Sequence, residues 1–107
     1  MAFYIKQNDT SPSMLATLQD ANGDAVNITG ASIRLHMRAI GSNQTTVDAA
    51  ATIVTAESGI VRYDWIAADT DTIGSYQAEF EVTYADASVE TFPNDGYIRV
   101  EIIDDIA

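Results

Sequence analysis

The sequence predicts an all-β fold, an antiparallel β-sandwich of about seven to eight short strands. Apolar and polar side chains alternate with a period of two along most of the chain, which is typical of strands with one buried and one wet face. Turn-forming residues interrupt these runs about every 8–12 residues, the spacing expected of a sandwich or barrel. The length of 107 residues predicts a single domain over residues 1–107 with one hydrophobic core.

The clearest expected strand covers residues 74–84, where the apolar positions fall on one face and the polar positions on the other. Residues 47–51 are rich in alanine and are expected to be a loop that leads into a strand. The other expected strands show the same alternation or a short apolar run, and they cover residues 3–5, 14–18, 33–38, 51–55, 60–65 and 97–102.

Segments rich in glycine, asparagine and aspartate separate these strands. Residues 20–24 are expected to form a hairpin loop, because Asn22-Gly23 can adopt positive φ. Residues 66–72 are expected to form a single helical or 3₁₀ turn. The remaining turn signals lie at residues 29–30, 41–44, 57–59, 86–88 and 93–96.

The segment from Asp69 to Tyr76 is the most informative part of the sequence. It is a short acidic turn followed by Gly74 and by a tyrosine that opens a long alternating strand, and it resembles the E–F corner of immunoglobulin-like domains. In that corner the tyrosine hydroxyl reaches back to a backbone group upstream. Tyr76 and Gly74 are therefore structural candidates, Trp65 is expected in the core, and the sandwich is expected to be immunoglobulin-like.

Asp69 and Asp71 form an Asp-x-Asp pair and are weak candidates for a calcium site, because Ca²⁺ prefers several oxygen ligands. The competing interpretation is that these aspartates cap the turn, since the EF-hand spacing is absent. The sequence holds one histidine, His36, with no cysteine and no Gly-x-Ser-x-Gly run. We therefore expect no catalytic residues, no cofactor and no enzymatic activity.

Sixteen acidic residues and five basic ones give a formal net charge of −11. Nucleic acid and anionic membranes are not expected as partners, because both need clustered lysine and arginine. The acidity suits either the solubility of an abundant protein or the binding of a cation or a basic partner. No run reaches the ~20 apolar residues of a membrane span and no signal-peptide pattern opens the chain, so we expect a complete product made in the cytoplasm.

Four of the five basic residues fall on predicted outward strand faces: Arg34, Arg38, Arg62 and Arg99. If their strands are neighbours, cross-strand pairs with outward glutamates would cover one sheet. The alternative is a charged face that docks onto a copy of itself or onto a neighbouring protein. Arg34, Arg38 and Arg99, together with Tyr97, are therefore the interface candidates.

Several runs together resemble a known family. Residues 3–10 match its opening strand ending near Asp-Thr, and residues 18–23 match "L-x-D-x-x-G". Residues 26–33 match "V-x-L-T-G-A-x-V", with isoleucine at two positions where the family often has leucine and valine. Two later runs look like "G-x-V-x-Y" and "G-x-Y-x-A-x-F", at residues 59–63 and 74–80. Over residues 3–103 the chain resembles the N-terminal immunoglobulin-like domain of tailed-phage baseplate upper proteins and related phage modules.

The resemblance implies a non-enzymatic virion structural or adaptor protein that contacts other virion proteins, as a homo-oligomer or in a symmetric assembly. A tail, baseplate, fibre-base or capsid-surface (capsid-decoration) position stays open, because the sequence stops at Ala107 where baseplate upper proteins commonly continue. Docking is expected at an exposed strand edge, Phe3–Lys6 or Tyr97–Ile102. The alternative function is a surface-exposed module that binds carbohydrate or a host surface, with Tyr97 and Phe92 as its exposed aromatics.

Overall fold

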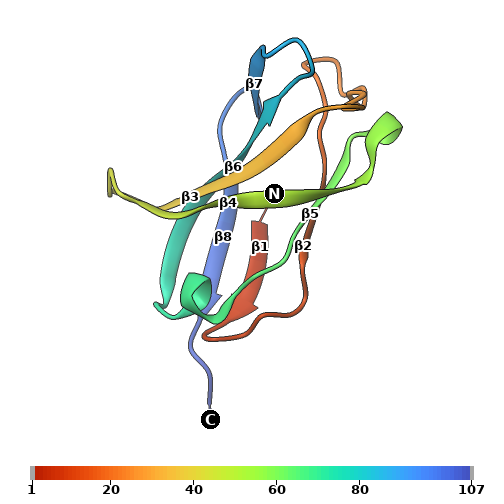
Figure 1. Ribbon diagram of the computed structural model, residues 1–107. Helices are drawn as coiled ribbons and strands as arrows, with labels where there is room; N and C mark the ends of the chain where they lie inside the picture. The colour runs from red at the N-terminus through yellow and green to blue at the C-terminus, as the bar shows by residue number, and fades with distance from the viewer. Residues whose placement is uncertain (1, 107) are drawn as a thin grey trace.

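The structure is a computed structural model that describes residues 2–106, and it is almost entirely β (Figure 1). Two short 3₁₀ helices, η1 (Ala56–Ser58) and η2 (Ala67–Thr70), interrupt the strands. The strands of the described residues are β1 (Ala2–Lys6), β2 (Met14–Thr17), β3 (Ser32–Ala39), β4 (Thr45–Thr55), β5 (Ile60–Tyr63), β6 (Gly74–Thr83), β7 (Val89–Phe92) and β8 (Ile98–Ile103).

The strands form two hydrogen-bonded sheets that share β4. Sheet A runs in the order β1-β8-β6-β3-β4, and β7 pairs with the end of β6. Sheet B contains β4, β5 and β2. The first part of β4 pairs with β3 and its last part pairs with β5, so this strand passes from one sheet into the other. The all-β prediction is confirmed; the strand pairs are antiparallel except β1 with β8, which is parallel.

The core lies between the sheets and is made by every second side chain of the strands. On β6 the buried positions are Tyr76, Ala78, Phe80 and Val82, as the alternation predicts. The neighbouring strands contribute their own alternate residues, among them Ile33, Leu35, Met37, Val61, Tyr63, Val100 and Ile102. The expected turns at residues 20–24 and 66–72 are confirmed, since Gly23 has a φ of +83° and η2 lies within the second segment.

Two expectations about the strands are wrong. Residues 47–51 are not a loop but part of β4, because Val47 is buried opposite Met37 and the side chains at 49 and 51 pack against the core. Packing against β3 outweighs the helix preference of a short alanine run. Residues 97–102 are not a sheet edge, because β8 pairs with β6 on one side and with β1 on the other. The edge of sheet A on this side is β1.

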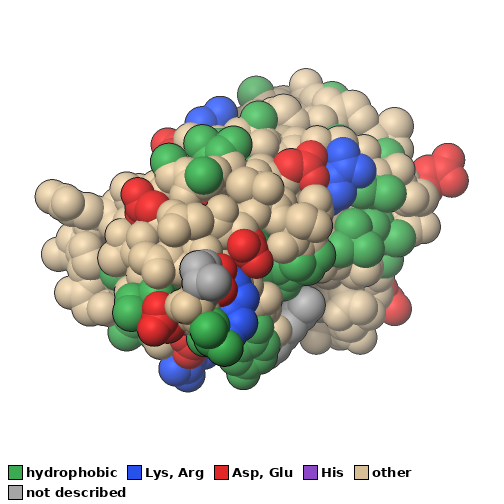
Figure 2. Space-filling model, turned by 90° about the horizontal axis from the view of Figure 1, so that it is seen from below, with side chains coloured by type: hydrophobic (Ala, Val, Ile, Leu, Met, Phe, Trp, Pro, Cys, Tyr) green, Lys and Arg blue, Asp and Glu red, His purple; other side chains and the backbone are tan. Residues whose placement is uncertain are grey.

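The surface is mixed rather than dominated by one kind of side chain. On the face that Figure 2 shows, acidic, basic and hydrophobic side chains are interspersed. No helix within residues 2–106 is long and apolar enough to cross a membrane.

Candidate functional site

The four interface candidates lie on the same surface, the outer face of sheet A. Arg34 and Arg38 project from β3, Arg99 projects from β8, and Tyr97 comes directly before β8. Their inward neighbours on the strands are buried, so these side chains point away from the core. Arg38 and Arg99 are both in register with Gln77 on β6, which places them in one row across three strands.

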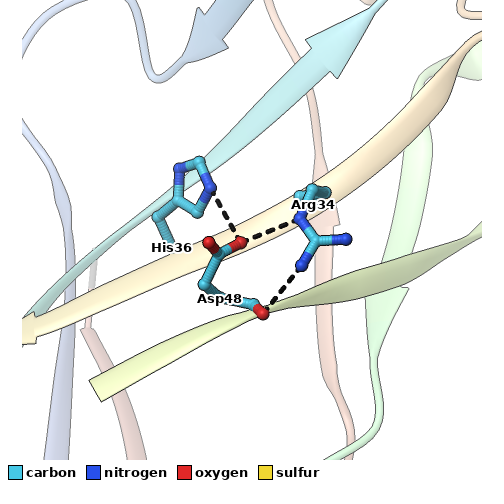
Figure 3. Close-up of polar contacts among 3 residues, drawn as sticks. All are labelled: Arg34, His36 and Asp48. Atoms are coloured by element: carbon cyan, nitrogen blue, oxygen red, sulfur yellow. Dashed lines mark hydrogen bonds and ion pairs between the residues drawn. The ribbon is translucent and has the colours of Figure 1, made fainter. Parts of the chain in front are cut away.

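Asp48 organises the β3–β4 part of this face (Figure 3). Its Oδ1 atom lies 2.8 Å from Nε of Arg34 and 3.2 Å from Nε2 of His36. Arg34 also donates from Nη2 to the backbone carbonyl of Asp48 at 2.8 Å. The hydrogen bond from Arg34 is the main reason why the pKa of Asp48 lies below its usual value. Arg34 and His36 are thereby held against β4 by one carboxylate.

Arg38 has a different environment. Its Nε lies 3.4 Å from Oε1 of Gln77 and its Nη2 lies 3.4 Å from the hydroxyl of Tyr97. Its guanidinium carbon lies 5.6 Å from the centre of the Tyr97 ring, a cation–π distance. Among the described residues, Arg38 forms no ion pair with a carboxylate. Its guanidinium therefore keeps donors free for a partner.

Arg38 and Tyr97 line a shallow hollow of about 360 Å³, which they share with His36, Asp48 and Glu79. Tyr97 is 48% exposed, so its ring is available at the surface of this hollow. The hollow combines an aromatic ring with a cation that forms no ion pair among residues 2–106.

The expected cross-strand Arg–Glu pairs are not formed among residues 2–106. Arg99 instead pairs with Glu101 of its own strand at 2.8 Å, and Arg62 of β5 pairs at 2.9 Å with Asp64, which directly follows that strand. The Ser75 hydroxyl donates to both carboxylate oxygens of Glu101, at 2.6 and 3.0 Å. This hydrogen bond, followed by Arg99, keeps the pKa of Glu101 below its usual value.

Two of the three structural candidates, Gly74 and Tyr76, lie where the turn before β6 ends, and Trp65 lies in the core. Tyr76 donates a hydrogen bond of 2.6 Å from its hydroxyl to the carbonyl of Thr72. Gly74 has a φ of +151° and begins β6, and a Cβ added there would lie 3.7 Å from the Tyr76 ring. Trp65 is 4% exposed and packs edge-on to Tyr63 with 5.0 Å between ring centres.

The two aspartates of the candidate calcium site, Asp69 and Asp71, accept hydrogen bonds from different groups. The Oδ2 atom of Asp69 accepts hydrogen bonds from the Tyr63 hydroxyl at 2.6 Å and from the Ile66 N–H at 3.0 Å, so it caps η2. Asp71 accepts from the Thr72 hydroxyl at 2.9 Å. Within residues 2–106, no group of three or more histidine, aspartate or glutamate side chains is arranged to hold a metal ion. These contacts favour the capping interpretation.

The aromatic pair expected for carbohydrate binding is not exposed together. Phe92 is only 1% exposed, because it pairs with Phe80 of β6 and packs in the core. The expectation of an exposed Phe92 is therefore wrong. Tyr97 is exposed, and its ring contacts Arg38.

The sequence-based prediction missed Asp48 and Gln77. Asp48 falls in the segment that was expected to be a loop, although buried Val47 and half-buried Ala49 flank it in an alternating pattern. Gln77 was placed on the outer face, but its position between Arg38 and Arg99 depends on which strands are neighbours. Local sequence carries no signal for that pairing.

The fold and this surface define an all-β sandwich domain with a tyrosine corner and a charged outer face. A family model described as the BppU N-terminal domain matches residues 2–93. The chain belongs to this family, the N-terminal domains of baseplate upper proteins, as the resemblance implied. Membership implies a structural domain of a phage baseplate, a location in the virion and contacts with other virion proteins.

Among solved structures, the crystal structure of CopC from Methylosinus trichosporium OB3b is similar, with a TM-score of 0.51. The two chains are 15% identical, and the alignment covers 99% of this chain and 87% of the other. At this identity the likeness shows the fold alone. Among curated proteins, no significant match was found.

Proposed function

We propose that the chain is a non-enzymatic adaptor domain of the virion and that the outer face of sheet A binds another virion protein. The observation that carries this proposal is the Arg38–Tyr97 pair, a cation without a carboxylate partner among the described residues, stacked on an exposed ring. Arginine and tyrosine are enriched at the centres of protein interfaces, because they combine a large contact area with directional hydrogen bonds.

The neighbouring charges support this assignment. Asp48 is engaged by Arg34 and His36, so it does not neutralise Arg38. Gln77 and the Tyr97 hydroxyl hold the Arg38 side chain at the hollow, which reduces the entropy that binding has to remove. A carboxylate or carbonyl of a partner would complete the donors that Arg38 leaves free.

The proposal includes a repeated arrangement. Virion proteins occur in copies related by symmetry, and many weak contacts of one kind add up to a stable assembly. We propose that the chain is incorporated as such a set of copies, either in contact with each other or with a shared partner.

The test is incorporation into particles. Phages carrying Arg38→Glu are purified, and the amount of this protein per particle is measured by quantitative mass spectrometry. Reversal of the charge at the hollow is expected to reduce incorporation by about tenfold or more, the effect of losing one interface contact of ~1.4 kcal/mol. Arg62→Glu is the matched control, since Arg62 has the same outward orientation but lies on sheet B.

The control protein is expected to be incorporated like the wild type, and thermal unfolding of both purified variants checks that each is folded. Normal incorporation of the Arg38→Glu protein would contradict the assignment of this face. Absence of the wild-type protein from mature particles would contradict the virion function itself.

A further inference from the structure

A second concave surface lies on the other side of Tyr97, between the end of β2 and the connection from β7 to β8. It is a groove of about 600 Å³. The buried side chains of Leu18, Phe92 and Ile98 line it together with exposed Tyr97, Asp20 and Asp95. The groove therefore combines apolar and polar side chains, with a carboxylate from each of the two connections.

One wall of this groove is an unpaired strand edge. β2 is the last strand of sheet B, and within residues 2–106 its one strand partner is β5. The Leu18 N–H donates to the Gly59 carbonyl and the Leu18 carbonyl accepts from the Val26 N–H, so Leu18 directs its backbone groups toward the rest of sheet B. In an antiparallel ladder, the direction of these groups alternates from one residue to the next. The backbone N–H and C=O groups of Leu15, Thr17 and Gln19 therefore point away from β5, toward the open edge of the sheet.

The opposite wall lies beyond the described pairing of β1 with β8. β1 pairs with β8 from Ala2, which is in register with Arg99. Tyr97 and Ile98 precede that point, and both line the groove. The groove thus begins where the pairing of β1 with β8 ends.

We propose that this groove takes an extended, basic segment of another virion protein, which adds a strand to β2. The inference rests on the proposed virion function and goes beyond it, by assigning a second surface and the chemistry of the partner that it binds. Backbone hydrogen bonds to Leu15, Thr17 and Gln19 would supply the pairing, and alternate apolar side chains would enter the groove. Lysine or arginine on the other positions would face Asp20 and Asp95.

Charge decides between the possible occupants. The chain has a formal net charge of −11, so a second copy would bring two strongly acidic molecules together. A basic segment gains from the same field, both in encounter rate and in specificity. Among proteins that could pair with an exposed strand edge, the net charge therefore favours one with a basic segment over a second copy of this chain.

The experiment uses the full chain and three synthetic probes. The first is a short peptide in which lysine and valine alternate; the second has glutamate in place of lysine. The third is the lysine peptide with N-methyl groups on the amides of one edge, which removes the donors of a strand pair but keeps the charge. Binding is followed by the shifts of the backbone amide signals in two-dimensional NMR.

The lysine peptide is expected to shift the amide signals of Leu15, Thr17 and Gln19 and those of residues 95–98 in a saturable way. N-methylation is expected to weaken binding about tenfold, and the glutamate peptide is expected not to bind. In the protein, Thr17→Pro removes one edge donor and is expected to abolish binding, whereas Thr17→Ala is expected to preserve it. Unfolding curves of both variants check that they are folded.

Several results would overturn the inference: shifts outside the groove, equal binding of the N-methylated peptide, or no saturable binding of the lysine peptide. A wild-type dimer in sedimentation that Thr17→Pro dissociates would assign the edge to a second copy and would also overturn it. If the Thr17→Pro protein is incorporated normally and the wild type does not bind the peptide, this inference is wrong. The proposed virion function is not affected by that result. Absence of the wild type from particles would remove the proposed function instead.

Discussion

The hydroxyl of Tyr76 donates a hydrogen bond of 2.6 Å to the backbone carbonyl of Thr72 and ties the start of β6 to the turn before it. Burial, followed by the charge of Asp71, raises the pKa of this hydroxyl, so it stays a donor further into the alkaline range than an ordinary tyrosine. Tyr76→Phe removes the hydroxyl, so the Thr72 carbonyl loses this hydrogen bond. We expect the free energy of unfolding to fall by about 1–2 kcal/mol in urea denaturation. Tyr4→Phe is the control, since Tyr4 is 62% exposed, and a change within about 0.5 kcal/mol is expected there.

Gly59 and Gly41 both have positive φ, +65° and +87°, but only Gly59 is enclosed. A Cβ on Gly59 would lie 2.6 Å from the Val26 carbonyl oxygen and 2.9 Å from that of Leu18, whereas nothing lies within 4 Å at Gly41. We expect Gly41→Ala to cost about 1–2 kcal/mol of unfolding free energy from the left-handed backbone alone. Gly59→Ala is expected to cost clearly more, because backbone atoms have to move. Equal unfolding midpoints of the two variants would contradict this explanation.

Asp69 and Asp71 are expected to differ in their effect on stability. Asp69→Ala removes the acceptor of the Tyr63 hydroxyl and of the Ile66 N–H, and should lower the free energy of unfolding by about 1–3 kcal/mol. Asp71→Ala removes only an acceptor for the neighbouring Thr72 hydroxyl and should cost less. Because the Asp69 carboxylate is engaged, we expect added calcium to leave the melting temperature unchanged. A calcium-dependent increase that Asp69→Ala abolishes would instead support the metal site.

Tyr84 couples the end of β6 to β7 through a hydrogen bond of 2.6 Å to the Glu90 carboxylate. Burial, followed by this hydrogen bond, raises the pKa of Tyr84 to about 12. The folded state then holds the proton more tightly than the unfolded chain, whose tyrosines ionise near pH ~10. The stabilisation is therefore complete below about pH 10 and is lost as the pH rises toward 12.

Urea denaturation across this alkaline range should show the loss, and Tyr84→Phe should make it smaller. Glu90→Gln removes the charge next to the hydroxyl and is expected to lower the pKa of Tyr84, measured by tyrosinate absorbance. An unchanged titration in the Glu90→Gln protein would contradict the role of this contact.

Wherever one face of a strand is buried, the alternation of apolar and polar residues was sufficient to predict which side chains enter the core. The alternation of residues 76–82 predicted which side chains of β6 enter the core, because a strand turns every second residue to the same side. The turn chemistry of residues 20–24 was equally local, since Gly23 takes its positive φ within a few residues of chain. The candidates Arg34, Arg38, Tyr97 and Arg99 were also placed outward by the alternation alone.

What the sequence could not supply was the identity of each strand's neighbours. Arg34 pairs with Asp48 because β4 lies beside β3, and the alanine-rich start of β4 is held there by packing rather than by its own propensity. Phe92 is buried because β7 pairs with β6, and β8 is not an edge because β1 adds to it in parallel. Each of these facts depends on residues distant in the sequence.

The parallel pairing of β1 with β8 has a mechanical consequence. Five register pairs join them, from Ala2 with Arg99 to Lys6 with Ile103. Tension applied between residue 2 and residue 103 pulls along these two strands, so it loads their hydrogen bonds in shear and all at once. Separation would require the whole ladder to yield together rather than one bond after another, so these two strands should resist being pulled apart along their length.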